Sequence, residues 1–237
     1  MQRRPLITHI GLGDNIVQTG MARTLAERYG AIAFPCYEFY EASVKSFFVN
    51  DPGVEVYTLP HDLSWDWGSP PDGVWDRRIK ECGFEGEPIR AGNYSGRGTD
   101  WDFTSSFYLH AEVPYDDRFD KCPIFEAAKS VEQLPVEFPN DKRIFLHDDP
   151  MRGYTITRFR DRNEAYHPDA TGVTSSILRY LNLILAAVEL HVIDSCFFHF
   201  INSLPFVPGR LYLHQYPRWP RHWGFRYPSR LNWTYLP

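Results

Sequence analysis

The sequence predicts an α/β fold built from two halves, each with its own parallel sheet. Strand-like and helix-like segments alternate over the first 60 residues and alternate again from residue 143 onward. Such alternation is typical of parallel strands joined by right-handed helical crossovers. A chain of 237 residues is long enough for one large domain or two small ones. It is short for two complete halves of this kind, so we expect an abbreviated second half and an extended C-terminal tail.

The first half, residues 1–140, begins with a strand, a Gly-rich turn and a helix. Apolar side chains at Val17, Met21 and Leu25 recur at helical spacing and predict one buried helix face. Pro, Gly, Asp and Trp interrupt the pattern over residues 61–100, where we expect a loop-rich insert. The remaining predicted elements are strands at 6–10, 30–34 and 54–58, and helices at 41–49 and 102–111, the latter with Phe103 and Phe107 facing inward.

The second half, residues 141–215, contains the most strongly patterned helix of the chain. This predicted helix covers residues 175–189, and its apolar side chains form one wide face. A strand at 143–147 precedes it and a strand at 190–194 follows it. Ser195 then occupies the position where the cap of another short helix is expected.

The C-terminal tail, residues 216–237, is basic and rich in aromatic residues. No Asp or Glu occurs after Asp194, so the net charge of −5 divides into +5 for residues 195–237 and −10 for residues 1–194. Terminal segments are usually ordered only when they dock, and we therefore expect the tail to pack back on the acidic body. The positive charge comes from five arginines, namely Arg210, Arg218, Arg221, Arg226 and Arg230.

Composition excludes several classes of protein. With 43% hydrophobic and 23% charged residues, the chain is neither disordered nor a minimal scaffold. No apolar run reaches the roughly 20 residues that a membrane-spanning helix needs, and the N-terminus does not resemble a secretory signal. The four cysteines lie far apart, without the CxxC spacing of zinc or redox sites. We expect a soluble cytoplasmic protein with reduced thiols and no membrane span.

Polar clusters follow three of the predicted strands, and ligands of α/β sheets bind at the carboxyl ends of strands. In the first cluster, Gly11 and Gly13 allow a sharp turn and a close backbone approach to a ligand. The dinucleotide motif GxGxxG would need a third glycine where this chain has Ile16, which argues against a nicotinamide enzyme. Asp14 is either a helix cap or a general base for an acceptor hydroxyl.

The other two clusters offer groups for an anionic ligand. Ser195 and His199 are one helical turn apart beside Asp194, an arrangement suited to a diphosphate, although capping and core packing would also explain them. In the cluster 147–154, Arg152 can grip a phosphate with two donors, and His147 lies at the strand end. Neighbouring residues rarely converge on one metal ion, so we expect no metal.

Two segments resemble the heptosyltransferase-type family of glycosyltransferases, which have the GT-B architecture of two Rossmann-like halves facing a cleft. Residues 7–29 are similar to the opening strand, Gly-Asp turn and first helix of that family. Residues 191–199 are similar to its donor loop, in which an Asp-Thr or Asp-Ser pair precedes a histidine. The size resembles that of compact phage and bacterial glycosyltransferase-like proteins.

The resemblance implies a metal-independent transfer of a sugar from a nucleotide-diphosphate sugar to a glycan or other hydroxyl acceptor, without a cofactor. Asp14 would act as the base. Asp194, Ser195 and His199 would contact the donor diphosphate. From their own positions at strand ends, we expect Gly11, Gly13, His147 and Arg152 to line the same donor site. The aromatic loop between Trp65 and Trp101 would cover the acceptor.

Two alternatives come from other classes of function. Arginines interleaved with aromatic residues in the tail suit single-stranded nucleic acid, which predicts a nucleic-acid binding protein or a glycosyltransferase that modifies DNA bases. A catalytically inactive protein that binds a sugar nucleotide would share the donor residues but would never release a free nucleotide diphosphate.

Overall fold

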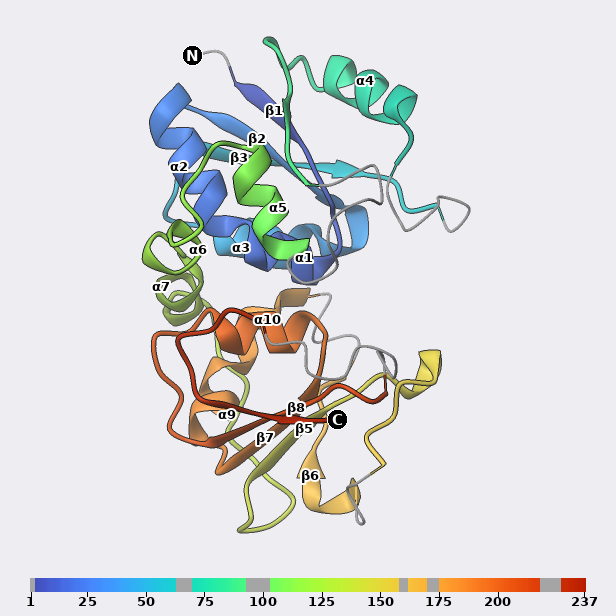
Figure 1. Ribbon diagram of the computed structural model, residues 1–237, viewed down its shortest axis with the longest axis vertical. Coiled ribbons are helices and arrows are strands. Elements are labelled where there is room, and N and C mark those ends of the chain that lie inside the picture. The colour runs from blue at the N-terminus through green and yellow to red at the C-terminus, as the bar shows by residue number, and fades with distance from the viewer. Residues whose placement is uncertain (1–2, 63–69, 93–102, 158–161, 170–174, 218–226) are drawn as a thin grey trace.

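The computed structural model describes residues 3–62, 70–92, 103–157, 162–169, 175–217 and 227–237. It contains two parallel sheets with helices packed against them, which confirms the prediction of an α/β fold with Rossmann-like character. Figure 1 shows the two halves one above the other, with helices α1 and α10 facing each other between them.

The first sheet has four parallel strands in the order β3-β2-β1-β4. Alternate residues of its strands point to opposite faces, as in β2, where Ile32 and Phe34 face one layer and Ala33 the other. Its strands are β1 (Arg4–Ile7), β2 (Ile32–Tyr37), β3 (Val54–Leu59) and β4 (Ile89–Arg90). Helices α1 (Leu12–Val17), α2 (Thr19–Tyr29), α3 (Glu41–Phe47) and α5 (Phe103–His110) cover one face, and α4 (Asp72–Glu81) covers the other.

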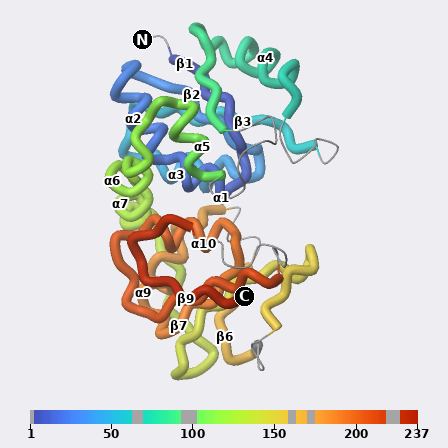
Figure 2. The backbone as a smooth tube through the Cα atoms, in the orientation of Figure 1, coloured from blue at the N-terminus to red at the C-terminus, as the bar shows by residue number. Residues whose placement is uncertain are grey.

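Two short helices, α6 (Asp117–Asp120) and α7 (Ile124–Lys129), follow α5 and lead from the first half to the second. Figure 2 shows them along one side of the molecule, beside the boundary between the halves. Gly20 makes the packing of α2 on α6 feasible, because a Cβ atom at that position would lie 2.0 Å from the carbonyl oxygen of Asp117.

The second sheet has five parallel strands in the order β6-β5-β7-β8-β9. The last of them, β9 (Trp233–Leu236), comes from the C-terminal tail and pairs with β8 (Arg210–His214). The other strands are β5 (Ile144–His147), β6 (Ala165–Tyr166) and β7 (Glu189–Ile193). The helical elements are η3 (Pro150–Arg152), η4 (Arg162–Glu164), η5 (Ile177–Tyr180), α9 (Leu181–Ala186) and α10 (Cys196–Asn202).

Buried side chains of both halves belong to one hydrophobic cluster. It includes Leu6 and Phe34 from the first sheet, Phe145 and Val192 from the second, and helix residues between them. The two halves therefore pack against each other through a common core.

Three predicted elements differ from the structure. The helix expected at 175–189 ends at Ala186, because the backbone of Val188 bonds to Arg143, just before β5, and to Arg210 of β8 instead of continuing the helix. The insert expected to consist of loops at 61–100 contains α4 and β4. The helix expected after the first strand divides at Gln18, where the Thr19 hydroxyl donates to the carbonyl of Ile16, a contact that bends helices.

Details of two aromatic predictions also changed. Phe107 is buried as expected, but Phe103 at the start of α5 is exposed. The loop between Trp65 and Trp101 lies partly outside the described residues, which omit 63–69 and 93–102.

Candidate functional site

The order of the strands places one topological switch point in each sheet. In the first sheet, strands β2 and β3 are added on one side of β1 and β4 on the other, so the switch point lies between β1 and β4. In the second sheet, β6 is added on one side of β5 and the later strands on the other, so the switch point lies between β5 and β7. Ligands of open parallel sheets bind beyond the carboxyl ends of the strands at such points. The sequence-predicted residues follow β1, β5 and β7, and they therefore surround both switch points.

At the first switch point, the turn after β1 leads directly into α1. Gly11 is the residue that precedes α1, and its carbonyl accepts the bond from the backbone N–H of Asn15. Asp14 is the third residue of the helix rather than its cap, and its carboxylate lies in the first turn, where the helix dipole favours negative charge. The Asp14 charge, added to burial, raises the pKa of Tyr37 at the end of β2 to about 12.

His9 lies in the same turn and carries a perturbed pKa, although sequence reasoning did not select it. Burial lowers the pKa of His9 to about 4, so its imidazole is neutral at pH 7. Its ring meets Phe103 and Phe107 edge-on, at centroid distances of 4.8 and 5.8 Å. The side-chain amide of Gln18 donates to the His9 carbonyl and fixes the turn.

At the second switch point, a hydroxyl and an imidazole meet. Ser195 Oγ and His147 Nδ1 lie 3.0 Å apart, which joins the end of β7 to the end of β5. Burial lowers the pKa of His147 to about 4 and outweighs the opposite effect of Asp148 and Asp149. Ser195 precedes α10 as predicted, but its side chain makes no capping hydrogen bond and contacts His147 instead.

Asp194 is buried between two partners. Only 7% of it is exposed, and its Oδ2 accepts a hydrogen bond of 2.7 Å from the Tyr227 hydroxyl. Its Oδ1 lies 3.6 Å from Nε2 of His199, which is itself buried. Sequence reasoning did not find Tyr227, because 33 residues separate it from Asp194 and no local pattern reports such a contact.

The two switch points meet where α1 contacts α10. A Cβ atom on Gly13 would lie 3.0 Å from Cδ2 of His199 and 3.6 Å from the backbone nitrogen of Cys196. The sequence predicted that Gly13 lets the backbone approach a ligand closely. In the structure its missing side chain lets α1 approach the start of α10, so the turn that contains Asp14 meets the helix that carries His199.

Arg152 lies within electrostatic range of His147 but forms its ion pair elsewhere. Its exposed guanidinium pairs with the carboxylate of Asp149 at 2.5 Å. It is close enough to Tyr40 to influence the pKa of that hydroxyl, which burial and the nearby Cys196 thiol raise to about 12. The predicted phosphate-binding arginine therefore lies at the border of the site, beside the first half.

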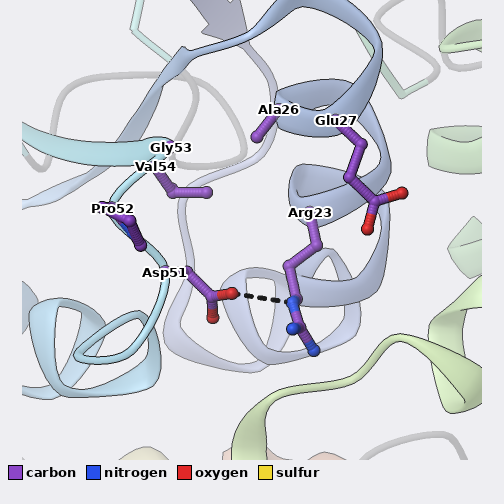
Figure 3. A pocket seen from close by; sticks show the side chains of 7 residues that line it. All are labelled: Arg23, Ala26, Glu27, Asp51, Pro52, Gly53 and Val54. Carbon is purple, nitrogen blue, oxygen red and sulfur yellow. Dashed lines mark ion pairs between the residues drawn. The ribbon is translucent and has the colours of Figure 1, made fainter.

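A pocket of about 200 Å³ lies away from these residues. Arg23, Ala26 and Glu27 of α2 line it together with Asp51, Pro52, Gly53 and Val54. Figure 3 shows the ion pair between Arg23 and Asp51, whose atoms are 2.8 Å apart. Because Val54 begins β3, the pocket lies at the amino end of a strand, whereas the switch-point residues lie at carboxyl ends.

The described part of the tail joins both halves of the protein. Arg230 forms an ion pair of 2.6 Å with Asp120 of α6, and its guanidinium stands over the ring of Phe119 at 5.0 Å. Arg210, which precedes the tail in β8, pairs with Glu189. The other three arginines of the tail, Arg218, Arg221 and Arg226, lie outside the described residues.

Among the residues that the structure describes, no group of three or more His, Cys, Asp or Glu side chains is arranged to hold a metal ion. In the same part of the chain, no helix has the length and apolar character required to cross a membrane. The four cysteines are free thiols. No family model, curated protein or solved structure matches this chain.

Proposed function

We propose that this protein is a metal-independent glycosyltransferase with a GT-B-like arrangement, which moves a sugar from a nucleotide-diphosphate sugar to an acceptor hydroxyl. One observation supports this proposal above the others. The two segments that resemble heptosyltransferases, residues 7–29 and 191–199, are far apart in sequence but meet at the contact of α1 with α10. Each also borders a switch point, where ligands of parallel sheets bind.

In this proposal the second half holds the donor. Ser195 and the neutral imidazole of His147 offer hydrogen bonds to diphosphate oxygens, and His199 lies one turn along α10. The Asp194 carboxylate is already engaged by Tyr227, which limits its repulsion of the phosphates. Arg152 would exchange its exposed ion pair with Asp149 for the diphosphate, because a guanidinium binds phosphate with two parallel hydrogen bonds.

The first half would then supply the base. Asp14 takes the proton of the acceptor hydroxyl, whose oxygen forms the new bond to the anomeric carbon. The bond between that carbon and the diphosphate breaks, and the electron pair leaves with the diphosphate. Donors that hold the departing diphosphate stabilise the charge that develops there.

A thermal-shift screen against nucleotide diphosphates and their sugars tests donor binding. A ligand at about 100 times its Kd should stabilise the fold by roughly 2.7 kcal/mol. If none of these compounds raises the Tm, the proposal of a sugar-nucleotide protein fails. An inactive binder would respond in this screen but would release no nucleotide diphosphate in the presence of acceptors.

The role of Asp14 is tested with the donor that the screen identifies. Asp14→Asn should abolish nucleotide-diphosphate release with acceptor, a loss of about 100-fold or more for a general base, while the donor-induced Tm shift stays within error. Asp72→Asn is the matched control, because Asp72 is also an acidic residue in the first turn of a helix, α4. Equal turnover in Asp14→Asn and wild type would rule out Asp14 as the base.

A further inference from the structure

Four aromatic rings gather at the carboxyl end of β2, beside α1. The ring of Phe39 lies parallel to that of Tyr37, with centroids 5.5 Å apart and planes at 12°. His61 stands edge-on to both rings, at 4.9 and 5.0 Å. Tyr40 completes the group with an edge contact of 4.2 Å to Phe39. We call these four residues the aromatic platform.

The platform has a buried side and a side open to solvent. Tyr37 is buried and Tyr40 is half-buried, so they anchor the platform in the fold. Phe39 is 40% exposed and His61 is exposed. Phe39 presents its ring to water as part of this cluster of four rings, and contiguous exposed apolar surface marks ligand-binding sites more often than single exposed side chains do.

The platform also borders the groups proposed for catalysis. Tyr37 is close enough to Asp14 for the carboxylate to contribute to its raised pKa. Tyr40 is within electrostatic range of Arg152 and Asp149 of the second half. A ligand resting on Phe39 and His61 would therefore lie between the proposed base and the border of the donor site.

The charges around the platform select against an anionic ligand. Besides Asp14, the flanking carboxylates include those of Glu38 and Asp62, which are exposed, and Glu41, which pairs with Lys45 at 2.7 Å. These carboxylates would repel a phosphate that rested on the platform. A neutral ligand with an apolar face and hydroxyl groups suits both the rings and the carboxylates.

We propose that the aromatic platform is a subsite for a neutral pyranose ring of the acceptor, with Phe39 as its main contact. The face of an aromatic ring is partly negative and attracts the partly positive C–H groups on one side of a sugar ring. The opposite edge of the sugar carries hydroxyls that can donate hydrogen bonds to the Asp14 carboxylate. This inference deepens the proposed glycosyl transfer and rests on it for the identification of the sugar as an acceptor.

Saturation-transfer difference NMR tests the subsite directly. The probes are the methyl pyranosides of glucose, galactose, mannose and N-acetylglucosamine, at millimolar concentration with wild-type protein. At least one probe should receive saturation on its ring C–H protons. Phe39→Ala and Phe39→Leu should reduce that signal at least fivefold, whereas Phe39→Tyr should retain it, because only tyrosine keeps an aromatic face. Phe206→Ala is the control, since Phe206 is 55% exposed on the second half.

Two outcomes would overturn the subsite, namely no saturation of any probe, or a signal that Phe39→Ala leaves unchanged. The same samples, titrated with the nucleotide-diphosphate sugars of the thermal-shift screen, separate this result from the proposed function. A sugar signal that depends on Phe39 without any donor response would leave a sugar-binding site but refute glycosyl transfer. A donor response equal in wild type and Phe39→Ala, with no sugar signal, would refute the subsite alone.

Discussion

The hydrogen bond from Tyr227 to Asp194 should be among the more costly single hydrogen bonds to remove. Its acceptor is a carboxylate that is only 7% exposed, and the donor oxygen is 2.7 Å away. Hydrogen bonds to charged groups contribute about 1.5–3 kcal/mol, and a buried acceptor that loses its donor bears a desolvation cost. His199 does not replace the donor, because its Nε2 is 3.6 Å from the other carboxylate oxygen. Tyr227→Phe should therefore lower the free energy of unfolding by about 2 kcal/mol.

Tyr57→Phe provides a control with the same geometry and a neutral acceptor. The Tyr57 hydroxyl donates to the backbone carbonyl of Leu6, also at 2.7 Å. Its removal should cost about 1 kcal/mol. For a protein of this size, 1 kcal/mol corresponds to roughly 2–4 °C in Tm, so calorimetry should show decreases of about 4–8 °C for Tyr227→Phe and about 2–4 °C for Tyr57→Phe. Urea unfolding followed by Trp fluorescence at pH 7 gives the free energies directly.

A double-mutant cycle separates the charge from the packing of the ring. In the background of Asp194→Asn, the cost of Tyr227→Phe should fall to that of a neutral hydrogen bond, about 1 kcal/mol. The reasoning is refuted if Tyr227→Phe costs no more than Tyr57→Phe, or if its cost is the same with Asp194 and with Asn at that position. Either result would mean that the tail contributes packing alone to this site.

Two further predictions concern the remaining structural features. Gly20→Ala should lower the free energy of unfolding by about 1–3 kcal/mol, since its Cβ would fall 2.0 Å from a backbone oxygen of α6. Gly73→Ala, whose Cβ would meet no atom within 4 Å, should leave that free energy unchanged or raise it by less than about 1 kcal/mol. Equal urea midpoints for the two variants would contradict this. Burial holds the pKa of His147 near 4 against an ordinary 6.5, so the unfolded chain takes up this proton first and stability is lost as pH falls from about 6.5 to 4. In His147→Gln, the stability lost between pH 6.5 and 4 should be smaller by roughly 3 kcal/mol than in wild type. If the urea stabilities of wild type and variant fall in parallel with pH, the imidazole is not the cause.

The convergence of the strand-end clusters could be predicted from sequence, because parallel strands of one sheet end at one edge. His147 ends β5 and Ser195 follows the adjacent strand β7, and the two side chains lie 3.0 Å apart for this reason. Their individual contacts could not be predicted. A serine at the start of a helix normally caps it, and only the tertiary position of β5 turns the Ser195 hydroxyl toward an imidazole.

Other features depend on contacts that no local pattern encodes. The helix α4 rests on Trp75 and Ile79, one turn apart, in a stretch whose prolines and glycines favour loops. The shortened helix before β7 follows from the backbone bonds of Val188 to the residue just before β5 and to β8. Tertiary pairing of this kind overrides the helical periodicity of residues 175–189, since the hydrogen bonds of the sheet replace those of the helix.

The common core of the two halves bears on how the proposed reaction would be organised. Separate domains joined by a linker must close around their substrates, and that closure has an entropic cost. Here Phe34 and Phe145, from different sheets, belong to one hydrophobic cluster, and Arg230 of the tail pairs with Asp120 of the first half. These contacts hold the turn of Asp14 against α10 before any ligand binds. The residues proposed as base and as donor contacts are therefore preorganised by folding, which would lower the reorganisation that the proposed reaction requires.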